Sequence, residues 1–345
     1  MTNTSVATGD NQVRKLWNEQ LFRAATKESF FYQTGLMGDG ENKAVQVNTE
    51  LTKTSGDRVR FHLVPRLTGS GVTEGQTLRG NEEALQTYTF DVTLEELAHA
   101  VASDGPLSRQ RAIYEFEKTA KEKLQGWMSE KIDEKIFSVL TGASAAPTKV
   151  FYKTSSGIQL TATENTAKTA LTAADSKLTP AMLTQMGAWA RSGGNRTQEP
   201  LRPIRIDGED FLVLLVHNDV AADFFENSAF QAAMTYAEAR GKDNPLFRGS
   251  KMIYNNIIVR AHENCTIATD GGGASVAWSR AVLMGQQAVC WAWGERPKLL
   301  KDMDDYGRVQ GVGISSMYGV AKTKFNSLDY GSIGVFLART KISDL

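Results

Sequence analysis

The sequence has little cysteine and little histidine. Among 345 residues there are two cysteines, Cys265 and Cys290, which do not form a Cys-x-x-Cys pair. A disulfide framework or a cysteine-based zinc site is therefore not expected, and a reducing cytoplasm suits the chain. The four histidines are scattered and form neither an HxxxH nor an HExxH motif: His62, His99, His217 and His262. Isolated histidines are usually structural, so the sequence predicts no metal and no cofactor.

The chain also lacks an excess of either charge. Its 39 Lys and Arg residues balance 39 Asp and Glu residues, which gives a formal net charge of +0. Tight binding of nucleic acid or of an anionic membrane requires a strong positive field, so the composition disfavours both functions. Loose contact with DNA is compatible with the zero net charge. No apolar run is long enough to span a bilayer, and residues 1–10 lack the apolar segment of a secretory signal.

The sequence contains two segments in which apolar and polar residues alternate, joined by a long connection. Apolar and polar side chains alternate in residues 57–64 and again in residues 85–94, which is typical of half-buried strands. The connection, residues 66–84, is glycine-rich and far longer than a hairpin loop of about 2–5 residues, and loops of that length are commonly functional. Because a two-stranded ribbon is marginally stable alone, we expect it to lie on another surface, of the same chain or of a neighbour.

A long amphipathic helix is predicted directly after the ribbon. Apolar residues recur every three to five positions from residue 107 to residue 141, Ser108 is a candidate cap, and Gly142 ends the pattern. Such a helix is about 50 Å long. Its single apolar stripe favours a spine that lies along a flat domain over one arm of a helical bundle.

Shorter elements fill the rest of the chain, whose 41% apolar residues allow one large domain or two to three smaller ones. The pattern predicts an α+β fold. The expected elements are an amphipathic segment at 11–37 with Trp17 and Phe22, a loop with short strands at 143–177, a helix that begins at Thr179 and Pro180, a buried strand at 211–216, a helix at 220–240, a strand at 251–260, and strand-like stretches at 281–293, 308–323 and 330–339.

Three segments carry a partial likeness to chemical motifs. Residues 69–75 are glycine-rich but lack the Gly-Lys-Ser/Thr ending of a phosphate loop and do not lead into a helix. Residues 302–307 begin like a calcium loop, yet the twelfth position is Gly313 where glutamate is required, so we expect a solvated acidic turn. His217 follows a strand, where polar residues can be catalytic, but no Ser or Asp partner motif accompanies it. The sequence predicts no catalytic constellation and no enzyme.

The order of elements and two local motifs resemble a known family. Residues 55–61 (SGDRVRF), 75–78 (GQTL) and 80–85 (GNEEAL) resemble the "G-D-x-V … E-G … L-x-G-x-E" extended-loop signature of phage N4-like major capsid proteins. Residues 211–217 are similar to that family's "Y-V-x-L-V-H-P" strand, with Asn218 in place of the usual proline. Over nearly the whole chain, the arrangement is similar to the HK97 fold of tailed-bacteriophage major capsid proteins.

The resemblance implies a domain organisation and a set of contacts. It implies an N-terminal arm (1–48), an extended loop (49–98), a peripheral domain (99–142 with about 281–345) that contains the spine helix, and an axial domain (about 143–280). Residues implied to contact other subunits are Thr68, Gly69, Gly71, Glu74, Gly75, Leu78, Arg79, Gly80, Trp17 and Phe22.

The resemblance also implies partners and a location. The partners would be copies of the chain itself in hexamers and pentamers, a portal, an optional decoration protein, and packaged double-stranded DNA in non-specific contact. A separate scaffolding protein is expected, since no helical segment precedes the arm. No membrane is involved, and the virion capsid would form in the host cytoplasm. Two alternatives stay open here: an encapsulin-like compartment shell, and a soluble α/β enzyme with its site near His217.

Overall fold

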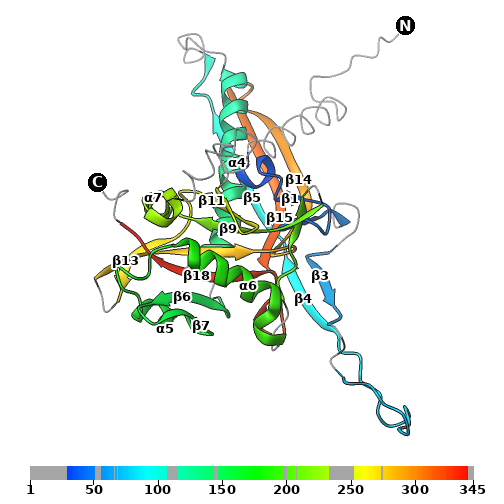
Figure 1. The fold of residues 1–345 in the computed structure, drawn as a ribbon. Helices are drawn as coiled ribbons and strands as arrows, with labels where there is room; N and C mark the ends of the chain where they lie inside the picture. The colour runs from blue at the N-terminus through cyan, green and yellow to red at the C-terminus, as the bar shows by residue number, and fades with distance from the viewer. Residues whose placement is uncertain are drawn as a thin grey trace.

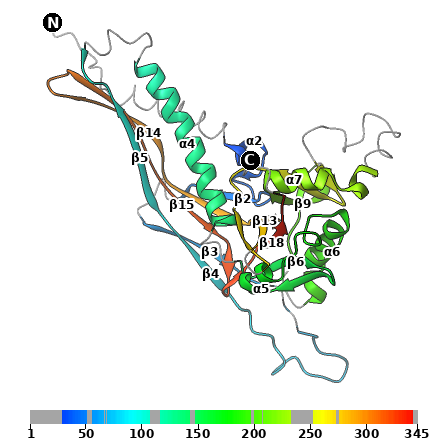
Figure 2. The ribbon, with the colours of Figure 1, turned by 90° about the vertical axis from the view of Figure 1, so that its left-hand side faces the viewer.

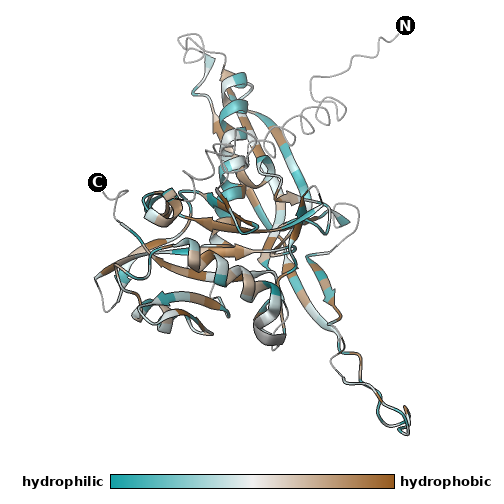
Figure 3. Cartoon of the chain, viewed as in Figure 1, coloured by the Kyte–Doolittle hydropathy of each residue, from teal (hydrophilic) through white to brown (hydrophobic). Residues whose placement is uncertain are grey.

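The protein contains two β-sheets, a long helix and a loop that projects far from both sheets, in a computed structural model (Figures 1 and 2). The structure describes residues 29–50, 56–65, 67, 69–106, 116–142, 147–196, 200–206, 208–232, 252–272 and 275–340. Figure 3 shows that the strands of the larger sheet are mostly hydrophobic, whereas the projecting part mixes both kinds of residue. The core therefore lies in the two sheets, and the projection carries little of it.

The first sheet has five strands and is covered on one side by the long helix. Its order is β1-β2-β14-β15-β5. The strands are β1 (Met37–Gly38), β2 (Val45–Asn48), β5 (Glu95–Ala102), β14 (Val289–Asp304) and β15 (Val309–Lys322), and the helix is α4 (Phe116–Thr141). Buried α4 residues such as Met128 and Ile132 share a core with Trp291 and Trp293, and Trp291 stacks on Tyr318 at 4.6 Å between ring centroids. A flat sheet and a rigid helix thus support each other along their length (Figure 2).

The second sheet has nine strands and contains the most hydrophobic part of the chain. Its order is β10-β11-β9-β13-β18-β6-β7, with β8 beside β9 and β12 beside β13. The strands are β6 (Val150–Thr154), β7 (Gly157–Thr161), β8 (Ile204–Ile206), β9 (Glu209–Val216), β10 (Met252–Tyr254), β11 (Ile257–Ala261), β12 (Ile267–Gly271), β13 (Val276–Met284) and β18 (Ser332–Ala338). Three helices pack around it: α5 (Glu164–Thr169), α6 (Pro180–Arg196) and α7 (Asn218–Phe225).

A separate two-stranded ribbon carries the projecting loop. It pairs β3 (Arg58–Leu63) with β4 (Tyr88–Thr93), and β5 continues almost directly from β4. The short helix α2 (Phe30–Gln33) lies against α4, and β16 (Lys324–Phe325) with β17 (Leu328–Asp329) forms a second small ribbon. The projecting loop, residues 64–87, extends away from the body on the side opposite the far end of the five-stranded sheet (Figure 1).

Several sequence-based expectations are confirmed. The two predicted alternating segments are strands that pair with each other, with Val59 opposite Val92 and Phe61 opposite Phe90. The spine helix ends at Thr141 as predicted, while its expected cap, Ser108, lies outside the described residues. Helix α6 begins at Pro180, and the Thr179 hydroxyl accepts a hydrogen bond from the Met182 amide at 3.3 Å, which satisfies one free amide of its first turn.

Three expectations are corrected, and one strand was not predicted. The predicted strand at 251–260 is a hairpin, because Asn255 and Asn256 both take positive φ (47° and 59°) and form a two-residue turn. The helical stretch predicted at 220–240, opened by Asn218 and Asp219, already ends at Phe225 as α7, and the Asn227 side chain caps a new turn; residues 233–240 lie outside the described residues. The stretch 281–293 is divided between β13 and β14 by residues 285–288, and β5 was not anticipated as a strand.

Candidate functional site

The projecting loop exposes several large apolar side chains. Leu67, Leu78 and Leu85 are 63%, 69% and 67% exposed, and Val64 is half exposed. Large apolar side chains gain nothing from water, so several of them on one extended loop mark a contact surface. Glu74, Gly75 and Gly80 on the same loop are also exposed. The loop is therefore the candidate functional site of the chain.

Hydrogen bonds within the loop preorganise its shape. The Glu83 carboxylate accepts a bond from the Gly69 amide at 2.7 Å, and the Glu82 carboxylate accepts one from the Gly80 amide at the same distance. The Asn81 side-chain amide donates to the Thr77 carbonyl at 2.8 Å. Gly80 has φ of 89°, in the region that favours glycine. Ordering the loop beforehand lowers the entropy lost when it meets a partner.

The ribbon that carries the loop is anchored by an apolar root. Val59 and Val92 are buried against Cys290 and Ala292 of β14, and Phe90 contacts Phe325 at 6.2 Å between ring centroids. Burial raises the pKa of the Cys290 thiol to about 11, so this cysteine is an unreactive packing residue. The root holds the ribbon against the same chain, whereas the loop beyond it has no such support.

Two glycines allow the close approach at this root. A β-carbon at Gly319 of β15 would lie 2.4 Å from the Thr93 carbonyl oxygen, and one at Gly294 would lie 2.6 Å from the Leu94 side chain. Any other residue at Gly319 would push the ribbon away from the sheet, whereas at Gly294 the Leu94 side chain would have to move. Sequence analysis missed both positions, because a glycine inside a strand pattern signals only a bulge or a close contact of unknown partner.

An exposed ion pair links the two strands of the ribbon. The Arg60 guanidinium donates two hydrogen bonds to the Asp91 carboxylate, at 2.7 and 2.9 Å. The hydrogen bond from Arg60 lowers the pKa of the Asp91 carboxyl below its ordinary value. This bidentate pair lies directly across the strands and helps to hold their register.

The N-terminal end of the described chain is tied to the spine helix by Asp133. Its carboxylate accepts hydrogen bonds from the Ser29 hydroxyl at 2.6 Å and from the Phe30 amide at 2.7 Å. His262 stacks on Phe137 of the same helix at 4.4 Å between ring centroids and also contacts Phe30. Sequence analysis missed Asp133, because an acidic residue in a charged helix gives no signal of its own.

Of the predicted contact residues, Trp17, Phe22 and Thr68 lie outside the described residues.

His217, the runner-up candidate for catalysis, has a structural role. Its side chain is buried, and its Nδ1 accepts a hydrogen bond from the Asp219 amide at 3.2 Å, so it caps α7. The Asp219 carboxylate is itself paired with Arg339. The described residues contain no group of three or more His, Cys, Asp or Glu side chains that could hold a metal ion. No described helix is both long and apolar enough to cross a membrane.

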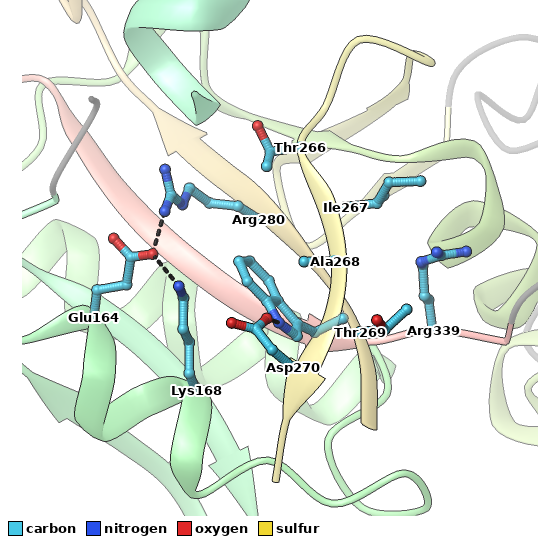
Figure 4. A pocket seen from close by; sticks show the side chains of 10 residues that line it. Glu164, Lys168, Thr266, Ile267, Ala268, Thr269, Asp270, Arg280 and Arg339 are labelled. Carbon is cyan, nitrogen blue, oxygen red and sulfur yellow. Dashed lines mark hydrogen bonds and ion pairs between the residues drawn. The ribbon is translucent and has the colours of Figure 1, made fainter. Parts of the chain in front are cut away.

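A polar hollow of about 560 Å³ lies beside β12 and β13, and its charges are already paired (Figure 4). Arg280 forms an ion pair with Glu164, which also pairs with Lys168 at 3.0 Å. Arg280 further donates to the carbonyls of Thr141, at 3.0 Å, and of Gly142. It thus joins the end of the spine helix to the nine-stranded sheet. The hollow therefore lies where α5, the nine-stranded sheet and the end of the spine helix meet.

Comparisons with known proteins agree with this picture. A family model for phage capsid proteins matches residues 5–337. The major capsid protein of Pseudomonas phage KPP25 is 24% identical, with 97% of each chain aligned. The capsid of Ralstonia phage GP4 superposes with a TM-score of 0.76 at 25% identity, over 99% of each chain. The capsid of cyanophage Pam1 gives 0.77 at 24% identity, over 92% of this chain and 93% of that one.

These matches settle the coarse questions that the sequence left open. They favour neither a compartment shell nor an enzyme, and they indicate a structural, non-enzymatic protein of the virion. The likeness to the N4-like group in particular stays a prediction. Since the family model covers nearly the whole chain and the solved neighbours share its α+β, HK97-like architecture, the protein belongs to the phage capsid protein family.

Proposed function

We propose that the chain is the major capsid protein of a tailed phage, and that its copies assemble as hexamers and pentamers into an icosahedral shell around double-stranded DNA. Membership of the phage capsid family is the observation that carries this proposal. A capsid role implies self-association, and the projecting loop offers the surface for it. The zero net charge suits a shell that meets packaged DNA without binding it tightly.

The two sheets support a division into domains that sharpens the one expected from sequence. The N-terminal arm (1–48) and extended loop (49–98) stay as predicted, and their inner ends, β1, β2 and the start of β5, pair into the five-stranded sheet. We assign the rest of that sheet with α4 to the peripheral domain and the nine-stranded sheet to the axial domain. Strand β18 and the second half of β13 fall in the range predicted for the peripheral domain, but β18 pairs with β6 and β13 with β9, so we assign both strands to the axial domain.

The predicted contact residues of the loop support contact with a neighbouring subunit. Gly69, Gly71, Glu74, Leu78 and Arg79 all lie on its exposed surface. The loop projects past the body of its own chain, so a partner has to be supplied by another molecule (Figure 2). Further proposed partners are a portal, a scaffolding protein and a decoration protein, with assembly in the host cytoplasm.

Shortening the loop tests the proposed contact. Replacing residues 66–85 with a two-residue Asn-Gly turn keeps the ribbon register, in which Leu63 is opposite Tyr88, but removes the projection. We expect the variant to fold, with an unchanged circular dichroism spectrum, and to form no closed particles in sedimentation or electron microscopy. Arg205→Met, which removes only an exposed ion pair with Asp210 on the nine-stranded sheet, serves as the control and should assemble normally. Normal particle yield from the shortened variant would refute the loop's role.

A further inference from the structure

The chain passes from the nine-stranded sheet to the five-stranded sheet through residues 285–288, which we call the crossover. Within it, Gln287 takes a φ of 54°, in the left-handed region that is unfavourable for residues other than glycine. Among the described residues, the other non-glycine positions with positive φ come in pairs at the tips of hairpins: Asn255 with Asn256, Asp305 with Tyr306, and Asn326 with Ser327. Gln287 instead lies between two sheets, and it lacks the short side chain that helps asparagine to adopt this conformation. Its backbone is therefore strained, and its surroundings have to hold it.

Hydrogen bonds hold the crossover from two sides. The Gln286 amide donates to the Arg202 carbonyl, just before β8 of the nine-stranded sheet, at 2.7 Å. The Gln287 amide donates to the Lys43 carbonyl, also at 2.7 Å. Lys43 belongs to the turn between β1 and β2, residues 39–44, which we call the arm turn. The strained residue is thus bonded to the arm turn.

Asn42 joins the arm turn to the nine-stranded sheet. Its side-chain oxygen accepts a hydrogen bond from the Arg205 amide, and its side-chain nitrogen donates to the Arg205 carbonyl, each at 2.7 Å. The side-chain amide has one acceptor and one donor group, so it pairs with both backbone groups of this β8 residue as a neighbouring strand would. The same oxygen accepts a bond from the Gln286 side chain at 2.8 Å. The arm turn, the crossover and β8 therefore meet at Asn42.

The arm turn is also fixed to the five-stranded sheet. Strand β2 follows it directly and pairs with β14, with Val45 opposite Val289. The Val289 amide donates to the carbonyl of Ala44, the last residue of the arm turn, at 3.0 Å. In Figure 2, β2 lies where the two sheets meet. One short segment is therefore bonded to both sheets and to the crossover between them, and it restricts the angle at which the sheets meet.

We propose that the arm turn is a clamp that sets the angle between the two sheets, with Asn42 fastening it to β8 and Lys43 holding the crossover at Gln287. The clamp itself follows from contacts within one chain. Its consequence for a shell rests on the proposed function: subunits give a shell of constant curvature when the angle between their sheets is constant. Because the Asn42 bonds are exposed, water can replace them, and the clamp can open without unfolding either sheet.

Hydrogen exchange of the unassembled subunit tests the clamp. Asn42→Ala removes its side-chain bonds, and we expect exchange of the Arg205 and Gln287 amides to speed up about ten-fold, as loss of one or two ordinary hydrogen bonds would give. Asn48→Ala is the matched control on the same arm, because the Asn48 side chain accepts a local bond from the Glu50 amide at 2.8 Å. The control should leave both rates unchanged. Unchanged rates in Asn42→Ala would overturn the clamp.

A second variant tests whether the clamp holds a strained residue. Gln287→Gly removes the cost of the left-handed conformation, so the crossover no longer has to be held. Relative to Gln287→Gly alone, we expect the added Asn42→Ala to speed exchange at position 287 by less than about three-fold, because the two sites are coupled. The full ten-fold effect in this background would show that the two sites are independent, and the hold on the crossover would be refuted.

Particle geometry gives the readout for the assembled state. Wild-type and Asn48→Ala subunits should form particles of one diameter in cryo-electron microscopy, whereas Asn42→Ala should form particles of mixed diameters, since the angle between its sheets varies. Uniform particles from Asn42→Ala would contradict the role in curvature. Failure of the wild-type protein to form any shell would count against the proposed function, and the exchange rates of the free subunit would still decide the clamp.

Discussion

His262 and Asp133 place two ionisable groups in the joint between the arm, the spine helix and the larger sheet. Burial lowers the pKa of His262 below its ordinary value of 6.5, although Asp133 and Glu263 act in the opposite direction. Burial raises the pKa of Asp133 above 3.8, despite its hydrogen bonds from Ser29 and Phe30. The joint therefore favours a neutral imidazole and resists ionisation of the carboxyl group.

The lowered pKa of His262 predicts a loss of stability on acidification. The unfolded chain takes up this proton at higher pH than the folded chain, so the contribution is fully present above pH 6.5 and is lost as pH falls through the folded pKa. Asp133 acts with the opposite sign, because its raised pKa makes its contribution fall as pH rises above 3.8. We expect His262→Phe to reduce the drop in Tm of the unassembled subunit between about pH 8 and about pH 5. An unchanged drop would contradict this assignment.

Arg280 is the second residue whose environment carries a prediction. Its buried guanidinium satisfies the last carbonyls of α4 and pairs with Glu164. Arg280→Met leaves those carbonyls without a donor, and we expect it to lower the free energy of unfolding by about 2–4 kcal/mol in urea titrations. Arg205→Met, which removes an exposed pair with Asp210, should cost under about 1 kcal/mol. Equal costs for the two variants would show that burial of the Arg280 network contributes nothing.

Residue-level roles of this kind could not be predicted from the sequence. Asp133 caps a turn that begins 104 residues earlier in the chain, and Arg280 contacts a helix end 139 residues away. Neither position breaks a local pattern, so only the folded chain identifies their partners. His217 is different, because the sequence alone already disfavoured a catalytic role: no Ser or Asp partner motif accompanies it.

At the scale of elements, the root of the ribbon depends on Gly319. A β-carbon there would lie 2.4 Å from the backbone oxygen of Thr93, which cannot move without the ribbon. We expect Gly319→Ala to destabilise the subunit by about 1–3 kcal/mol and to speed amide hydrogen exchange in β3 and β4. Gly126→Ala in α4 is the control, since its β-carbon meets nothing within 4 Å, and it should stabilise by up to about 1 kcal/mol. Unchanged exchange in Gly319→Ala would contradict the close approach.

The elements that were predictable have strong local signals. The ribbon strands alternate cleanly, α6 has a Thr-Pro start, and β9 is a run of apolar residues. Strand β5 was missed because its sequence, EELAHAVA, is rich in Glu and Ala, which are poor strand formers. Pairing with β15 along eight residues overrides that propensity. The hairpin of β10 and β11 was missed because Asn-Asn is a weaker turn signal than Asn-Gly.

At the scale of the whole molecule, the subunit has one long dimension (Figure 1). The projecting loop with the exposed Leu78 lies at one end, and the far end of the five-stranded sheet lies at the other. Composition and periodicity predicted a ribbon that needs a surface. The family match over residues 5–337 is the basis for our proposal that this surface belongs to another subunit.

The central claim is that this chain builds a shell from copies of itself. Purified recombinant protein, examined by size-exclusion chromatography and cryo-electron microscopy, tests it most directly. The account predicts closed particles, or hexameric and pentameric rings, in which the loop of each subunit overlies its neighbour. A protein that stays a monomer or dimer at every concentration and shows no rings or shells would contradict it.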